Sequence, residues 1–170
     1  MQSDQVIDQR EIQKHGGAAA KYPTAFIISK FLTKYKFQKV LDVTYGRGRF
    51  YKVFRPSFLV GADIKKWEWE VAPDVFIQKP VWSLRYEEKL KNYTFDVVVV
   101  DPPWGLKQRR TEYSELLGTP DLIIEYAMKL AKELSVQYLL VHFNKLLNME
   151  VVENIGFKPW TRYLNTKNTI

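Results

Sequence analysis

Asp101-Pro102-Pro103-Trp104 follow directly on four valines at 97–100. A continuous apolar run is typical of a strand buried on both faces, so a charge, two prolines and a large aromatic meet where a core strand ends. The Asp101 carboxylate can accept hydrogen bonds, and the prolines fix the backbone without offering an N–H. Trp104 can stack on a flat ring. This combination favours a ligand site at the end of the strand; the alternative is a turn in which Asp101 caps a helix and Trp104 anchors the core.

A glycine-containing turn follows an earlier predicted strand. Gly46 and Gly48 let the backbone turn sharply and approach a ligand. A third glycine at position 51 would complete a dinucleotide-binding fingerprint, but Tyr51 stands there and disfavours nicotinamide and flavin cofactors. Asp63 ends the next predicted strand, where an acidic side chain suits hydrogen bonding to ribose hydroxyls. The alternative is a turn or capping aspartate. Ile64 then follows at a position suited to packing on a purine ring.

Strands and helices alternate along the chain and position these segments. We predict helices within 21–37 (beginning near Pro23), 49–54, 83–93, 120–134 and 148–156, and strands at 39–43, 58–63, 74–78, 95–100 and 137–143, with a strand-like segment within 157–166. This alternation predicts an α/β, Rossmann-like fold with a mostly parallel twisted sheet and helices on both faces. Ligands bind such sheets at the carboxyl ends of the strands, where the unusual residues cluster.

Length and composition limit the class of protein. The 170 residues suit one domain, which we expect to cover 22–170 after a loose N-terminal arm at 1–21, without a separate target-recognition domain. No apolar run is long enough to span a membrane and no signal-like N-terminus is present, so we expect a cytoplasmic protein. The net charge of +7 favours a polyanionic partner such as nucleic acid, with an ordinary basic surface as the alternative.

Three segments together resemble those of S-adenosylmethionine-dependent amino-methyltransferases that act on nucleic-acid bases. Residues 101–104 match that family's motif of Asp-Pro-Pro followed by Tyr, Phe or Trp. Residues 42–50 resemble its D-x-x-x-G-x-G-x-F cofactor loop, and residues 22–24 resemble the segment that precedes this loop. The order of the segments is similar to that in the gamma group of DNA amino-methyltransferases, and the resemblance spans roughly residues 20–145.

The resemblance implies a methyltransferase fold, S-adenosyl-L-methionine as cofactor and an exocyclic amine as methyl acceptor, with adenine N6 in DNA favoured and cytosine N4 or RNA adenine left open. It implies cofactor contacts by Tyr22, Pro23, Thr24, Asp42, Thr44, Tyr45, Gly46, Gly48, Asp63, Ile64 and Gln78. The catalytic group would be Asp101, Pro102, Pro103 and Trp104, with two acceptors for the amine and a stacking ring. Phosphate contacts are expected from Lys107, Arg109 and Arg110, although a solvated loop is the alternative.

Other readings stay open beside this one. Arg47 and Arg49 are unusual near a cationic sulfonium, so a non-catalytic nucleic-acid-binding or scaffold subunit is an alternative interpretation. A nicotinamide oxidoreductase is a third and weaker interpretation. A homodimer or a specificity subunit would compensate for the missing recognition domain. His15 and His142 lack metal-ligand spacing, so no metal is predicted, and we expect His142 to be a hydrogen-bonded core histidine.

Overall fold

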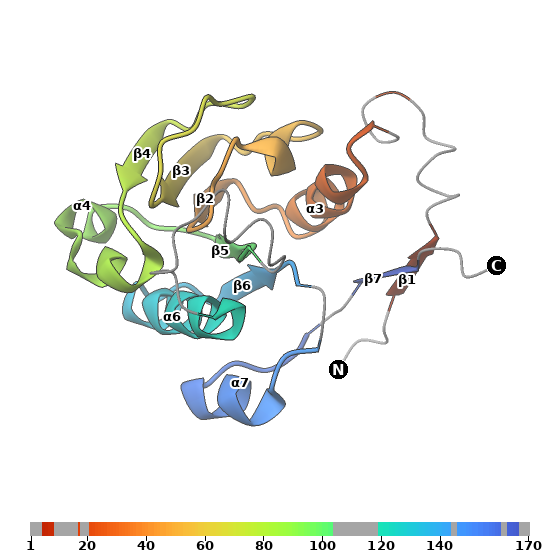
Figure 1. The fold of residues 1–170 in the computed structure, drawn as a ribbon. Coiled ribbons are helices and arrows are strands. Elements are labelled where there is room, and N and C mark those ends of the chain that lie inside the picture. Colours follow the sequence, from red (N-terminus) through yellow and green to blue (C-terminus); the bar gives the residue numbers. More distant parts are fainter. Residues whose placement is uncertain are drawn as a thin grey trace.

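A five-stranded parallel sheet organises the protein, and the computed structural model describes residues 5–8, 17, 21–103, 119–143, 146–160 and 163–166. The strand order is β4-β3-β2-β5-β6, and every neighbouring pair is parallel (Figure 1). The strands are β2 (Lys39–Asp42), β3 (Phe58–Asp63), β4 (Val75–Gln78), β5 (Val97–Val100) and β6 (Tyr138–Val141). All five lie where the sequence predicts strands, which confirms an α/β fold with an all-parallel sheet.

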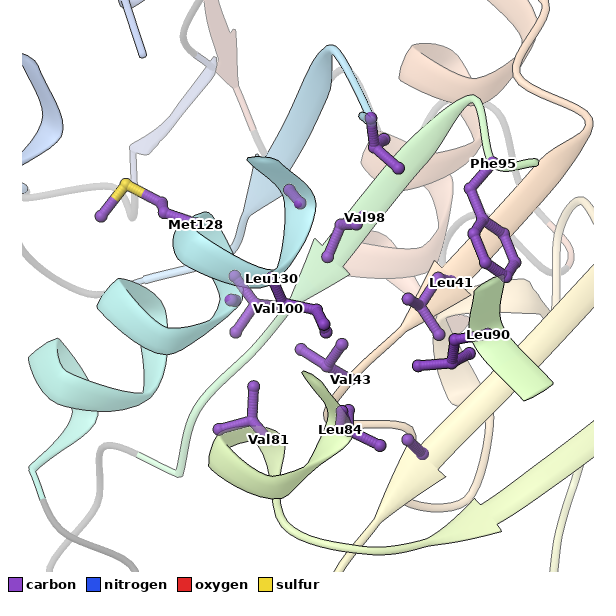
Figure 2. Packing of buried hydrophobic residues seen from close by; sticks show 14 of the residues in the cluster. Leu41, Val43, Val81, Leu84, Leu90, Phe95, Val98, Val100, Met128 and Leu130 are labelled. Atoms are coloured by element: carbon purple, nitrogen blue, oxygen red, sulfur yellow. The ribbon is translucent and has the colours of Figure 1, made fainter. Parts of the chain in front are cut away.

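Helices cover both faces of this sheet, as predicted. Along β5, Val97 and Val99 belong to one buried cluster with Leu32, whereas Val98 and Val100 belong to the other with Leu130. The first face carries α3 (Pro23–Lys34) and the 3₁₀ helix η1 (Arg49–Tyr51). The second face carries the 3₁₀ helix η2 (Val81–Tyr86), α4 (Glu88–Lys91), α6 (Pro120–Glu133) and α7 (Met149–Ile155), and Figure 2 shows side chains of this second core. Alternating side chains explain why all four valines are fully buried.

The helix ends follow from local sequence. The Thr119 hydroxyl accepts a hydrogen bond from the Leu122 amide (3.3 Å) at the start of α6, and Pro120 occupies its first turn. Asn148 caps α7 in the same way, and Gly156 ends that helix with φ +93°, a conformation that favours glycine. Among the described residues, no helix combines the length and hydropathy needed to cross a membrane.

The segment predicted as one amphipathic helix at 83–93 forms two shorter helices. Val81 and Leu84 both enter the core from η2, because residues three apart align on a 3₁₀ helix. Glu87 then adopts an extended conformation (φ −87°, ψ 99°), and α4 begins after it. Packing of Leu90 from α4 into the same cluster therefore requires a break that helical periodicity does not reveal.

A second, two-stranded sheet pairs segments near the two chain ends. Strand β1 (Gln5–Asp8) runs parallel to β7 (Tyr163–Thr166), apart from the main sheet (Figure 1). The sequence predicts the strand-like character of β7 but expects a loose arm at β1. The difference has a simple cause, because the partner of β1 lies more than 150 residues further along the chain.

Two leucines of α6 provide a matched test of this core. Leu130 is 2% exposed and Leu122 is 40% exposed. Leu130→Ala should lower the free energy of unfolding by about 2–5 kcal/mol through lost burial and a residual cavity. Leu122→Ala, the control, should change it by less than about 1 kcal/mol, as surface substitutions usually do. Urea unfolding of both variants measures the difference, and equal losses would contradict the packing described for α6.

Candidate functional site

The carboxyl ends of β2 and β5 meet at the point where the strand order reverses. The chain leaves β2 toward β3 on one side, and β5 pairs with β2 on the other. In open α/β sheets, the crevice beside this reversal is where ligands bind. Asp42 ends β2 and Asp101 follows β5, so the glycine turn and the Asp-Pro-Pro segment lie side by side.

Asp42 is the buried hub of this edge. It is 2% exposed, and its carboxylate accepts hydrogen bonds from the Thr44 amide (2.9 Å) and from the Tyr51 hydroxyl (2.7 Å). The Thr44 hydroxyl donates to Asp42 Oδ1 (3.4 Å) and accepts from the Asp101 amide (2.7 Å). Burial raises the pKa of Asp42 to about 7, and the charges of Asp101 and Asp63 add to the rise. Thr44 and the buried carboxyl group of Asp42 therefore link the ends of β2 and β5.

Tyr51 explains why the third glycine of the dinucleotide fingerprint is missing. Its ring stacks on Tyr45 at 5.8 Å between centroids, and burial raises the pKa of both phenols, which keeps them protonated. Tyr45 is 4% exposed, fills the space above Gly61 and donates its hydroxyl to the Val71 carbonyl (2.7 Å). Gly48 has φ +74° and lies against the same carbonyl. Tyr45, expected to contact a cofactor, is thus a core residue through its side chain.

Asp63 holds the glycine turn against β3. It is 4% exposed, and its two carboxylate oxygens accept hydrogen bonds from the amides of Gly46 (2.8 Å) and Lys65 (3.3 Å). Burial raises its pKa, and these backbone N–H groups oppose the rise. Each oxygen keeps a lone pair for a further donor. The turn role and a ligand role are therefore compatible at this residue.

A pocket opens beside these residues, on the face of the sheet that carries α6. It is a half-open depression of about 330 Å³, a volume that includes open solvent. Polar groups come from Thr44 and Asp63, and the rest of the lining is apolar. The residues that line it are Val43, Thr44, Asp63, Ile64, Pro80, Val81, Trp82, Pro103 and Ile123. A mainly apolar cavity with a few convergent polar groups is typical of a small-molecule site.

The predicted site residues fall into three groups. Thr44, Asp63, Ile64 and Pro103 line the pocket, whereas Asp42, Gly46, Asp101 and Pro102 lie beneath or beside it. Exposed Gln78 donates weakly to the Ile64 carbonyl (3.4 Å), while Tyr22, Pro23 and Thr24 begin α3 beside Lys52 of the glycine-turn region, outside the pocket lining. Trp104, Lys107, Arg109 and Arg110 lie outside the described residues.

Sequence reasoning missed two aromatic residues of this edge. Trp82 lines the pocket, and its position four residues after β4 ends was the available indication. His142 is not the core histidine that the apolar strand predicts: it follows the end of β6, its side chain is 36% exposed, and Nδ1 lies 2.8 Å from Asp101 Oδ1. The β5–β6 register brings these two residues together, and single-chain spacing does not encode that register.

Comparison with known proteins adds no family to this geometry: no family model, no curated protein and no solved structure matches the chain significantly. Among the described residues, no group of three or more His, Cys, Asp or Glu side chains is arranged to hold a metal ion. Functional interpretation therefore depends on the residues at the sheet edge themselves.

The raised pKa of Asp42 should appear as a pH dependence of stability. Its pKa is about 7 in the folded chain against a usual 3.8, so the folded chain holds a proton that the unfolded chain releases. Asp42 therefore lowers the free energy of unfolding as pH rises from about 4 to 7, by at most about 1.4 kcal/mol per pH unit. Asp42→Asn should remove this slope, and Tyr51→Phe should extend it to higher pH. Urea unfolding between pH 4 and 8 tests both; parallel curves for wild type and Asp42→Asn would contradict the assignment.

Proposed function

We propose that this chain transfers a methyl group from S-adenosylmethionine to an exocyclic amine of a nucleic-acid base, with adenine N6 in DNA as the favoured acceptor. One observation carries the proposal. The Asp101-Pro102-Pro103 segment stands at the carboxyl end of a central parallel strand, hydrogen-bonded through Thr44 to the glycine turn and adjoining a pocket. This is the juxtaposition that the resemblance of the separate segments implies.

The pocket has groups that fit the proposed cofactor. Asp63 offers a carboxylate for ribose hydroxyls, while Ile64 and Trp82 offer apolar and aromatic surface for a purine. The charges of Asp63 and Asp101 lie close enough to Asp42 to raise its pKa. Such a cluster of acidic groups favours a cationic ligand. The cofactor supplies a methyl group on a sulfonium, so that transfer leaves a neutral thioether and an amine nitrogen that must release one proton.

Asp101 and Pro102 suit the amine half of the reaction. An exocyclic amine is a weak nucleophile because its lone pair is delocalised into the ring. Asp101 can accept one N–H and the Pro102 carbonyl the other, which favours a pyramidal nitrogen. Pro102 and Pro103 are buried and lack N–H donors, so they hold that carbonyl rigidly without competing for the acceptors. Positioning of this kind accounts for much of the acceleration in well-oriented reactions.

Cations beside the pocket suit a nucleic-acid substrate. Lys65 and Lys66 are exposed directly after Ile64, and Lys65 Nζ lies 4.1 Å from the centroid of the Trp67 ring. Arg47 of the glycine turn approaches the same ring at 5.4 Å. These three cations can meet phosphates while the pocket side receives a base. A base within a duplex must flip out to reach such a site.

Replacement of Asp101 tests the chemistry directly. The chain should transfer labelled methyl groups from S-adenosylmethionine to nucleic acid, and Asp101→Ala should lower the rate by about 100-fold or more with nearly unchanged cofactor affinity. Asp63→Asn should instead weaken cofactor binding, which calorimetry measures. Full activity in Asp101→Ala would contradict the assigned role.

Separate incubations with duplex DNA, single-stranded DNA and RNA, followed by digestion and nucleoside analysis, identify the acceptor. Methylated deoxyadenosine is the expected product. Methylated deoxycytidine or adenosine would keep the chemistry and change the base or the polymer. Absence of both label and cofactor binding would instead favour a non-catalytic nucleic-acid-binding or scaffold subunit.

The phosphate role of Lys65 and Lys66 predicts a change in salt dependence. Their double replacement by alanine should weaken DNA binding and reduce the slope of log affinity against log salt by about 1 per lysine. The charge-matched control is Lys89→Ala/Lys91→Ala. Both lysines lie on α4, which leads into the amino end of β5, whereas the pocket lies at the carboxyl ends of the strands. Fluorescence anisotropy between 50 and 200 mM salt, a range that resolves such slopes, measures both. Equal slopes in the two double variants would remove Lys65 and Lys66 from the interface.

A further inference from the structure

Asp101 and His142 form a pair across the carboxyl ends of neighbouring strands. The register places Val100 opposite Val141, so the residue after each strand meets its counterpart. The His142 amide donates to the Val100 carbonyl (3.0 Å), and Nδ1 lies 2.8 Å from Asp101 Oδ1. This distance suits a hydrogen bond to a carboxylate. The pair is thus part of the strand pairing rather than a chance surface contact.

Both members of the pair are held by other parts of the site. The His142 and Phe50 rings pack in a T-shaped arrangement, with 5.5 Å between centroids and 84° between planes. Phe50 belongs to η1, directly after the glycine turn. The Asp101 backbone is held by Thr44 Oγ1 at 2.7 Å. Among the residues that the structure describes, none donates a hydrogen bond to Asp101 Oδ2.

We propose that His142 is a positioning residue for methyl transfer. Its Nδ1–H donates to Asp101 Oδ1 and fixes the orientation of the carboxylate, which leaves Oδ2 to accept an N–H from the target amine. The partner of one imidazole nitrogen selects the tautomer, so Asp101 holds His142 in the Nδ1–H form. This inference rests on the proposed function and adds to it a residue outside the Asp-Pro-Pro segment, directly after β6.

Three substitutions separate the N–H donor from the rest of the ring. Asparagine carries an amide nitrogen on Cγ, as histidine carries Nδ1, whereas glutamine places its amide one carbon further out. His142→Ala and His142→Gln should lower kcat by about 10- to 100-fold, a loss typical of a misplaced reacting group, with cofactor affinity unchanged. His142→Asn should retain most of the wild-type kcat. Circular dichroism and thermal unfolding check that each variant folds, and the Asn/Gln pair decides the result if His142→Ala does not fold.

A spectroscopic measurement gives a readout that is independent of turnover. The chain has two histidines, so a His15→Gln background leaves His142 as the sole imidazole signal. Nitrogen-15 NMR should show the Nδ1–H tautomer in that background and its loss in Asp101→Ala.

Wild-type kcat in His142→Gln, equal losses in the Asn and Gln variants, or a tautomer insensitive to Asp101 would overturn this inference alone. Absence of methyl transfer by the wild-type chain would overturn the proposed function and this inference with it.

Discussion

The parallel pairing of β2 with β5 is the constraint on which the site depends. Because both strands run in the same direction, the segments that follow them emerge at one edge of the sheet. The chain then diverges toward β3 and β6, and a crevice is left between the two connections. Thr44 bridges that point by bonding both Asp42 and Asp101. Asp42 of the glycine turn and Asp101 of the Asp-Pro-Pro segment are 59 residues apart in sequence, and they owe their proximity to this pairing.

A buried carboxyl group at this edge is costly unless it has hydrogen-bond donors. Asp42 receives three donors: the Thr44 amide, the Thr44 hydroxyl and the Tyr51 hydroxyl. The tyrosine takes the position where a dinucleotide-binding loop has a glycine, so the turn is stabilised from within the protein instead of being kept open for a pyrophosphate. Tyr45 and Gly48 serve the same packing, since both meet the Val71 carbonyl. Thr44 of the turn and its neighbour Asp63 face the pocket, whereas the Tyr45 and Tyr51 side chains lie in the core.

Local sequence predicted the elements of the sheet well and the irregular helices less well. Continuous apolar runs such as 97–100 identify strands because burial on both faces demands them. The break at Glu87 could not be predicted, because the two core contacts on either side of it, Leu84 and Leu90, impose it from outside the segment. The pairing of β1 with β7 has the same character: neither four-residue strand is explained without the other.

The sequence by itself determined the α/β class, the order of strands and helices along the chain, and the placement of Asp42, Asp63 and Asp101 at strand ends, since these follow from apolar runs and their polar boundaries. The tertiary structure alone decided which strands are neighbours. In that arrangement His142 lies beside Asp101, Trp82 lines the pocket and the Tyr45 side chain packs in the core. The physical reason is that strand register and packing are set by contacts between segments far apart in the chain, whereas periodicity reports only on neighbours within one segment.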